Sequence, residues 1–289
     1  MSESHAETRS VNPTGLLDHY AVDLLFDGDA AAVAALAGLA GLAGRFADSA
    51  FDVVESEAFL TLRHRLAFER GAPPEWTLGE PAPIHADALA SLLEQSWWWR
   101  DAESAAGRCT HARRLADHLF VTLDHRRRIG LFQQILAGAV QSLPCRAIAW
   151  WPSQQVIAPD DFLETMRADG FESPAPGALN VRLFRIPDPE GDAHLMDTLG
   201  LGALGLLDLQ CRFRGLDPHE VSHVLQATGI YLWQHGPVIR SGNSVQGLRP
   251  TDRWRCTARR SMAEPERELL DLDPGFPFGL GDQESVPYL

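Results

Sequence analysis

Apolar and polar positions along the chain repeat with two different periods, and each period predicts one kind of secondary structure. Apolar residues at every second position favour a β-strand, whereas apolar residues three and four positions apart favour a helix. The strands expected on this basis are 20–26, 51–54, 59–68, 119–123, 146–151, 180–186, 194–199, 237–240 and 253–259. The expected helices are 29–43, 86–98, 126–143, 159–168 and 217–234.

Proline and glycine mark several of the boundaries between these elements. Pro218 lies in the first turn of 217–234, which is the strongest predicted helix of the chain. The proline-rich run 71–83 is expected to be a loop, and the glycine-rich run 242–247 a turn. Residues 187–192 are expected to join the strands on either side of them into a hairpin.

The order of the elements predicts the fold class. Each half of the chain follows roughly β-α-β-β-α-β, the order of a ferredoxin-like unit, although the halves share no sequence identity. We therefore expect an α+β protein of two ferredoxin-like halves, 18–143 and 144–272, with largely antiparallel sheet. Residues 1–17 are expected to form a flexible leader and 273–289 a flexible tail, because these ends are polar or rich in glycine and proline.

Composition restricts the chemistry. Hydrophobic residues make up 45% of the chain and charged residues 22%, as in a folded globular protein. The formal net charge is −14, and all 25 basic residues are arginine. Without lysine, Schiff-base chemistry and a P-loop lysine are excluded. The acidic excess disfavours nucleic acid and anionic lipid and favours a basic protein as the partner.

Neither a targeting segment nor a cysteine motif is recognisable. The first 15 residues contain no apolar run, and no stretch approaches ~18 uninterrupted apolar residues, so a cytoplasmic protein without membrane contact is expected. The four cysteines form no CxxC pair. They are expected to pack as small buried hydrophobic residues rather than as disulfides or zinc ligands.

The most specific motif is an HExxH sequence at 219–223, within the strongest predicted helix. His219 and His223 lie on one helical face and are able to share a Zn²⁺ ion, while Glu220 is placed to activate a bound water as the catalytic base. Both histidines lie nearly opposite the apolar stripe of the helix. This placement fits a zinc-dependent peptidase, and it equally fits two histidines on a solvated face.

The third zinc ligand is not evident. In the extended HExxHxxGxxH pattern, Gln226 stands where glycine is needed and Gly229 where histidine is needed. His235 lies on a different face of the helix, and nothing marks a distant carboxylate such as Glu264 as a ligand. We therefore expect no cofactor and keep zinc as the alternative.

Two glycine-rich segments resemble nucleotide or nucleophile motifs. Residues 200–205 satisfy GxGxxG after a predicted strand, but no helix cap and no βαβ unit follow. Residues 242–247 miss a nucleophile elbow by one position. Tight turns explain both segments without catalysis.

The sequence also contains clusters of tryptophan and of arginine. Trp98 and Trp99 end a predicted helix, where core packing is the common role and an interaction surface the alternative; we name them as candidate interface residues. The arginine runs 113–114 and 126–128 lie among aspartates, so local ion pairs are expected rather than a nucleic-acid surface.

One region resembles a known family. The residues that carry the resemblance are Asp197-Thr198-Leu199-Gly200-Leu201, Leu204-Gly205-Leu206, Asp208-Leu209-Gln210, Leu216-Asp217-Pro218, Val221, Tyr231-Leu232, Gly236 and Gly242-Asn243-Ser244. They are similar to the bacterial DUF4261 family, a domain of unknown function. The resemblance is expected over most of 18–272 and is most specific at 197–247, with Leu207 in place of an expected proline.

The resemblance implies a binding role rather than catalysis. The family has no established catalytic residues, its own glycine pattern accounts for GxGxxG, and HExxH is not one of its features. Its members resemble small α+β domains encoded near bacterial secretion or toxin systems. The hypothesis is therefore a non-enzymatic protein-binding module, an immunity protein or adaptor for a basic toxin effector or secretion component; the alternative is a zinc-dependent hydrolase.

Overall fold

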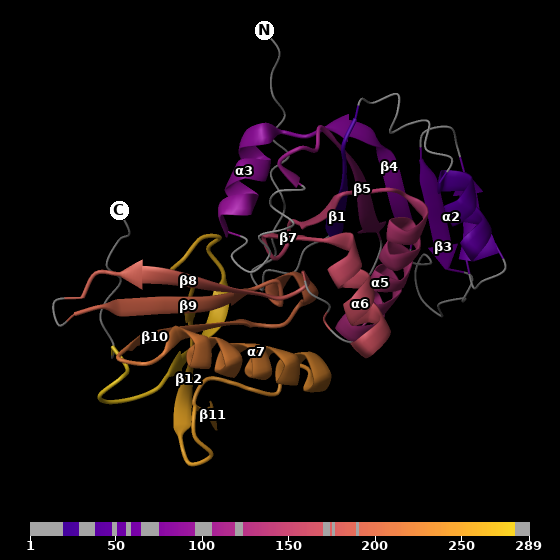
Figure 1. The fold of residues 1–289 in the computed structure, drawn as a ribbon. Coiled ribbons are helices and arrows are strands. Elements are labelled where there is room, and N and C mark those ends of the chain that lie inside the picture. The colour runs from indigo at the N-terminus through magenta and orange to yellow at the C-terminus, as the bar shows by residue number, and fades with distance from the viewer. Residues whose placement is uncertain are drawn as a thin grey trace, which may run out of the picture.

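The computed structural model describes residues 20–28, 38–47, 51–55, 59–64, 75–95, 106–118, 124–169, 174, 177–188 and 191–280. These residues form one sheet of seven strands and one of six, with helices packed on them (Figure 1). The expected α+β class with largely antiparallel sheet is confirmed. Within the described chain, no helix is long and apolar enough to cross a membrane.

The first sheet is built from the N-terminal part of the chain. Its strands are β1 (Ala21–Phe26), β2 (Phe51–Glu55), β3 (Leu60–His64), β4 (Glu75–Pro83), β5 (His111–His118), β6 (Ala147–Trp150) and β7 (Gln155–Ile157). They lie in the order β2-β3-β4-β5-β1-β6-β7, and each neighbouring pair is antiparallel.

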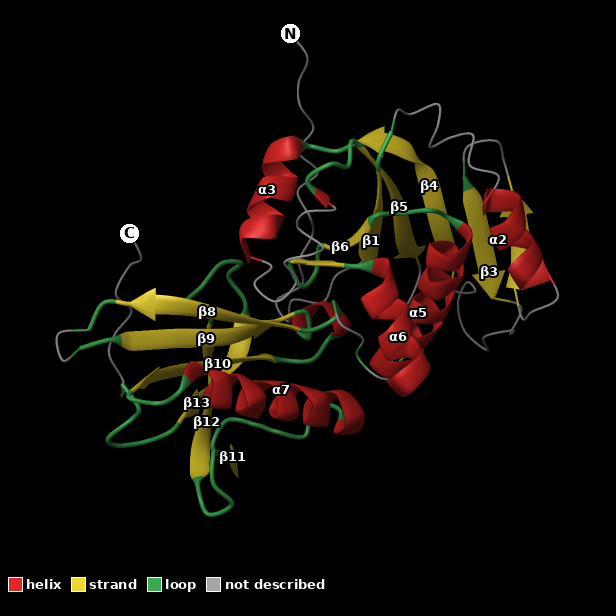
Figure 2. Ribbon diagram, viewed as in Figure 1, coloured by secondary structure: helices red, strands yellow, loops and turns green. Residues whose placement is uncertain are grey.

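Helices cover both faces of this sheet (Figure 2). They are α2 (Gly38–Ala47), α3 (Ala86–Gln95), α5 (His125–Ser142) and α6 (Pro159–Asp169). Leu24 of β1 packs in one core with Phe46, Phe132 and Phe162 of α2, α5 and α6. Its neighbour Leu25 points to the opposite face, where the α3 leucines are buried.

The second sheet contains β8 (Asn180–Ile186), β9 (Ala193–Leu199), β10 (Asp208–Arg214), β11 (Ser244–Gln246), β12 (Arg253–Arg260) and β13 (Glu268–Asp273). Their order is β11-β12-β13-β10-β9-β8, and β10 and β13 form its parallel pair. Helix α7 (Pro218–His235) packs on one face of this sheet (Figure 2). Strand β11 occupies one edge.

Local sequence explains the ends of α7. The Asp217 carboxylate accepts a hydrogen bond from the His219 backbone N–H at 2.9 Å, and Pro218 occupies the first turn. Gly236 ends the helix with φ of 77°, a left-handed conformation that glycine adopts at little cost. The predicted helix 217–234 is therefore confirmed.

The last turn of α7 connects the two sheets. Trp233 is buried in the same core as the helices of the first sheet. Its carbonyl oxygen lies 2.8 Å from Nε2 of His125, the first residue of α5. The short 3₁₀ helix η1 (Gly202–Leu204) also buries Leu204 in that core. The N-terminal end of α7 is thereby left beside the second sheet.

Several predicted elements need correction. Residues 75–83, expected to be loop, form β4, because Trp76 and Leu78 are buried against the core. The register of the β4–β5 pairing shifts between Leu78 and Pro81, and Pro81 and Pro83 lie after this shift. The strand predicted at 119–123 lies outside the described residues; the observed strand is β5, directly before it.

The C-terminal part also differs from expectation. Residues 237–240 form no strand, and part of the predicted turn 242–247 is β11. Strands β6 and β7 complete the first sheet, so the sheets divide the chain between Ile157 and Asn180 rather than at 143–144. Neither sheet follows the ferredoxin-like order, because the pattern did not predict strands β4, β5, β7, β10, β11 and β13.

The chain after β13 is attached to the second sheet. The Arg214 backbone N–H donates to the Phe278 carbonyl at 2.9 Å, and Gly279 forms an isolated bridge with Phe213. Of the predicted tail 273–289, residues 278 and 279 therefore bond to the end of β10, whereas Phe276 is exposed. The remainder of the tail and the predicted leader 1–17 lie outside the described residues.

Candidate functional site

The HExxH residues lie on the first two turns of α7. His219, Glu220 and His223 are exposed, whereas Val221, Leu225 and Leu232 are buried against the sheet, so the predicted division of the helix into two faces is confirmed. The rings of His219 and His223 meet edge to face, with centroids 4.5 Å apart. Their spacing is compatible with a shared ligand.

A complete zinc site is not formed by the part of the chain described here. Within those residues, no group of three His, Cys, Asp or Glu side chains is close enough to hold a metal ion. Catalytic zinc sites usually need three protein ligands. The histidine pair alone therefore lacks the donors that would hold the ion firmly.

The other candidate interface residues, Trp98 and Trp99, lie outside the described residues, directly after α3. Their role as an interface stays a prediction.

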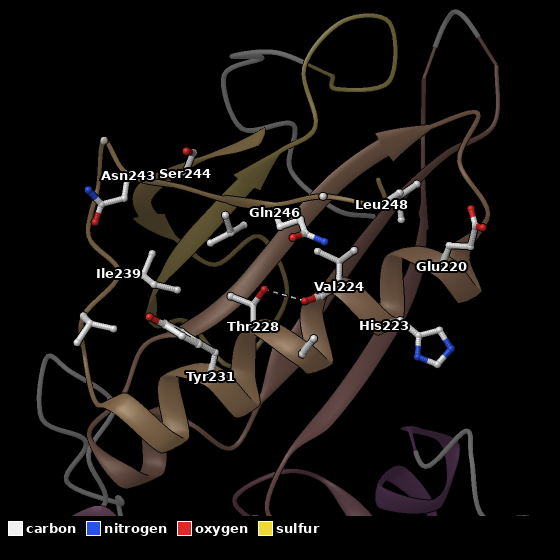
Figure 3. A pocket seen from close by; sticks show the side chains of 15 residues that line it. Glu220, His223, Val224, Thr228, Tyr231, Ile239, Asn243, Ser244, Gln246 and Leu248 are labelled. Atoms are coloured by element: carbon white, nitrogen blue, oxygen red, sulfur yellow. Dashed lines mark hydrogen bonds between the residues drawn. The ribbon is translucent and has the colours of Figure 1, made fainter. Parts of the chain in front are cut away.

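A groove runs along the outer side of α7 (Figure 3). Its volume is about 1090 Å³. One wall is the helix, and the other is the chain segment that returns from the end of the helix through β11. The lining residues are Glu220, His223, Val224, Ala227, Thr228, Tyr231, Val238, Ile239, Gly242, Asn243, Ser244, Val245, Gln246, Gly247 and Leu248.

The helix wall of the groove is partly apolar. Val224, Thr228 and Tyr231 point from α7 toward the strand, whereas the His223 ring points away from it (Figure 3). Tyr231 is 46% exposed and Val238, on the opposite wall, is 49% exposed. Large apolar side chains exposed together on the walls of a groove are typical of a binding site.

The strand wall is formed by the edge of β11. A strand that borders a groove with one face contributes every second residue, because side chains alternate. Here residues 242–248 line the groove without interruption. Main-chain as well as side-chain atoms of this segment therefore border the groove, and β11 is an edge strand of its sheet.

The groove was not predicted from the sequence as a site. In the structure Ser244 and Gln246 are exposed and Val245 is half-buried, which is the alternation of a strand. In the sequence the glycines on either side of these three residues favoured a turn instead. Its second wall, the face of α7 with Val224 and Tyr231, is defined only once the chain has folded back along the helix.

Two of the residues that carry the family resemblance, Asp197 and Asp208, belong to a buried ion network. Arg182 binds both carboxylate oxygens of Asp197 at 2.9 and 2.6 Å. Arg267 lies 2.7 Å from Asp197 and 3.2 Å from Asp208. All four side chains are buried. This arrangement stabilises the fold and offers no access to a substrate.

Asp208 also holds the glycine-rich segment 200–205. Its carboxylate accepts hydrogen bonds from the backbone N–H groups of Leu201 and Gly202, at 3.1 and 3.2 Å, and from the Thr198 hydroxyl at 3.1 Å. Burial raises the pKa of this carboxyl group, and the charge of Arg267 opposes the rise. The segment leads through the short 3₁₀ helix η1 into strand β10 and not into an α-helix, so the turn interpretation of GxGxxG is confirmed.

The cysteines are unsuited to nucleophilic chemistry. All four are free thiols, and Cys211 and Cys256 are buried in the core between α7 and the sheet. Burial raises the pKa of the Cys256 thiol to about 11, and raises that of Cys211 well above its usual value. Because the thiolate is the reactive form, these residues stay inert near neutral pH.

Residues 197–273 match the family model described as Domain of unknown function (DUF4261). The resemblance predicted from the sequence is thereby confirmed from the middle of β9 to the end of β13, which includes the groove and the Asp197, Asp208 and Arg267 members of the ion network. For residues 18–196 the resemblance stays a prediction. No curated protein and no solved structure matches the chain.

Proposed function

We propose that this chain is a non-enzymatic protein-binding module and that the groove between α7 and β11 is its binding site. The observation that carries the proposal is the combination of the two walls: the exposed Tyr231 on the helix, and on the other wall the exposed Val238 together with β11, an edge strand of its sheet. Grooves of this construction accept an extended peptide segment, which gains main-chain hydrogen bonds from the strand and specificity from the helix.

We further propose that the partner belongs to a bacterial toxin or secretion system, with the chain acting as immunity protein or adaptor. Support for this class comes from the resemblance to DUF4261 proteins. The net charge of −14 supports a partner that is basic as a whole, because complementary fields raise the association rate. The same charge disfavours nucleic acid and anionic membranes.

A pair of substitutions on α7 tests the binding site. Ala227 is exposed and lines the groove, whereas its neighbour Gln226 is exposed but does not line it. Ala227→Trp places a bulky side chain in the groove, and Gln226→Trp places the same side chain outside it.

In pull-downs from the native host, the wild type and Gln226→Trp should retain the same partner, identified by mass spectrometry, and Ala227→Trp should lose it. Equal retention by both variants, with circular dichroism showing both folded, would exclude the groove as the binding site.

One observation favours a second candidate function, zinc-dependent peptide hydrolysis. The His219 and His223 rings adjoin on an exposed face, and Glu220 lines one end of the groove. In such an enzyme the two imidazoles would hold zinc and Glu220 would take a proton from the attacking water. The proposal ranks second because the described residues supply no third ligand. Hydrolysis of a casein substrate that depends on added zinc and on Glu220 would reverse the ranking.

A further inference from the structure

We infer that the groove binds an extended acidic segment of its partner, which adds as a strand to the edge of β11 and places its carboxylates beside arginines of the β11–β12 region. The inference rests on the proposed binding function and specifies what enters the groove. Three properties of the site support it: the direction of the β11 main chain, the local charge, and the difference between the two faces of the strand.

The main chain of β11 has hydrogen-bonding groups directed away from β12. The Asn243 carbonyl accepts from the Cys256 N–H at 2.8 Å, and the Gly247 N–H donates to the Asp252 carbonyl at 3.2 Å. In an antiparallel ladder, alternate residues face the same neighbour. Ser244 and Gln246 therefore direct their N–H and C=O groups to the other side, where the described chain provides no neighbouring strand.

The β11–β12 segment is basic, whereas the whole chain is acidic; its arginines lie beside the residues that line the groove and not among them. Residues 240–260 contain six arginines and one acidic residue, Asp252. Arg240 and Arg249 are exposed and flank β11 at its two ends. In the ladder, Arg255 lies opposite Ser244 and Arg253 opposite Gln246.

Three of the six arginines are available to a ligand, whereas Arg259 pairs with Asp271 and Arg260 with Glu266. The side chains of Arg240, Arg249 and Arg255 make no hydrogen bond or ion pair within the described residues, and Arg253 donates to two backbone carbonyls, those of Pro250 and Asp252. The Asp252 carboxylate accepts from the Arg249 backbone N–H at 3.0 Å. The other acid at the groove, Glu220, lies at the opposite wall on α7.

The two faces of β11 predict the pattern of the bound segment. Ser244 and Gln246 share their face with the arginines of β12, so residues of an added strand on that face are expected to be acidic. Val245 points to the other face and packs against the core beneath α7. Residues of the added strand on that face meet Val224 and Tyr231 and are expected to be apolar. The ligand is therefore an alternating apolar–acidic strand.

Synthetic peptides test both charge and strand pairing with the full chain. The probe is a fluorescein-labelled heptapeptide of alternating valine and glutamate, and binding is followed by fluorescence anisotropy. We expect saturable binding that weakens at least tenfold when lysine replaces glutamate. Equal or tighter binding of the lysine peptide, or no saturable binding of the glutamate peptide, would overturn the inference.

Backbone methylation distinguishes strand addition from simple charge attraction. An added strand directs only alternate amides toward β11. Methylation of the glutamate amides should abolish binding if the strand is antiparallel to β11, and methylation of the valine amides if it is parallel. We expect one set to weaken binding at least tenfold and the other to leave it within about twofold. Similar effects of both sets would contradict pairing with β11.

Charge reversal in the protein provides the matched control. The double variant Arg240→Glu/Arg249→Glu should lose at least tenfold in affinity for the glutamate peptide, whereas Arg108→Glu, an exposed arginine in the first half of the chain, should not change it. An unchanged affinity of the double variant would contradict the assigned charges.

The peptide result is separable from the proposed function. If Ala227→Trp loses the native partner while the glutamate peptide fails to bind, the groove remains the binding site and the acidic-strand inference is wrong. If Ala227→Trp keeps the native partner, the proposed function itself fails.

Discussion

Arg267 lies with its Nη2 atom 2.7 Å from the Asp197 carboxylate, 70 residues earlier in the chain. The same guanidinium donates through Nε to Asp208 and through Nη2 to the Thr198 carbonyl. These contacts connect the loop before β13 to β9 and β10. Every partner is buried, so the ion network holds both ends of the segment that matches the family.

Removal of this arginine should be strongly destabilising. Arg267→Ala leaves two buried carboxylates short of a partner, and such a loss costs about 3–5 kcal/mol. Arg260 provides the control, because its ion pair with Glu266 is exposed and contributes about 1 kcal/mol or less. Urea denaturation of both variants gives the comparison. Equal losses would show that the network is solvated.

The face assignment of α7 predicts unequal effects within one helix. Leu225 is fully buried between the helix and the sheet, so Leu225→Ala should cost about 2–5 kcal/mol through lost contacts and the cavity left behind. His219 is exposed, and His219→Ala should change the free energy of unfolding by no more than ~0.5 kcal/mol. Chemical denaturation measures both values, and a large loss at His219 would show that this face is covered.

Zinc content tests the alternative function directly. Two histidines without a third protein ligand bind zinc weakly, so the purified chain should retain well below one equivalent after dialysis against buffer. Inductively coupled plasma mass spectrometry measures the metal. Retention of one equivalent that is lost in His223→Ala would establish a zinc site completed by a residue beyond the described part of the chain.

The raised pKa values of two thiols are expected to lower the stability of the folded chain at alkaline pH. Burial raises the pKa of Cys145 to about 12 and that of Cys109 to about 11, from a usual value of 9.0. A raised pKa means that the folded chain keeps the proton while the unfolded chain releases it. The contribution of each thiol is therefore complete below about pH 9 and decreases as the pH rises toward the folded pKa.

Comparison with Cys145→Ala isolates this contribution. The difference in free energy of unfolding between the wild type and the variant should decrease from pH 8 to pH 11, when both are measured by urea denaturation. A difference independent of pH would mean that the Cys145 thiol titrates alike in the folded and unfolded chains.

The parts of the fold that the sequence predicted well are those whose residues need only local partners. Helix α7 has its own cap in Asp217 and its own apolar stripe, and β8 and β9 pair through a short connection. Strand β5 was missed because its buried residues include Arg113 and Asp117. Asp117 becomes compatible with burial only when Arg128 of α5 binds its carboxylate at 2.7 and 2.9 Å.

The same reasoning explains why the site was predicted only in part. The HExxH spacing correctly placed two histidines on one exposed face, because that relation is a property of the helix itself. The groove depends on residues 238–248 lying beside α7. The basic charge of residues 240–260 was not evident from the net charge of −14, because the acidic residues are concentrated elsewhere in the chain.

The backbone conformation of Gly200 explains why the segment 200–205 needs glycine, and nucleotide binding is not required to account for it. It has φ of 125°, and a Cβ atom there would overlap the Ala178 carbonyl oxygen. Gly191 has a similar φ of 136° but open space around it. Gly191→Ala should therefore cost only the backbone strain, about 1–2 kcal/mol. Gly200→Ala should cost a further ~1–3 kcal/mol, because the backbone of Ala178 must move. Thermal and urea denaturation of the two variants separate strain from overlap. Equal losses would mean that Ala178 does not approach Gly200 this closely. In that case steric overlap would not be the reason for glycine at this position.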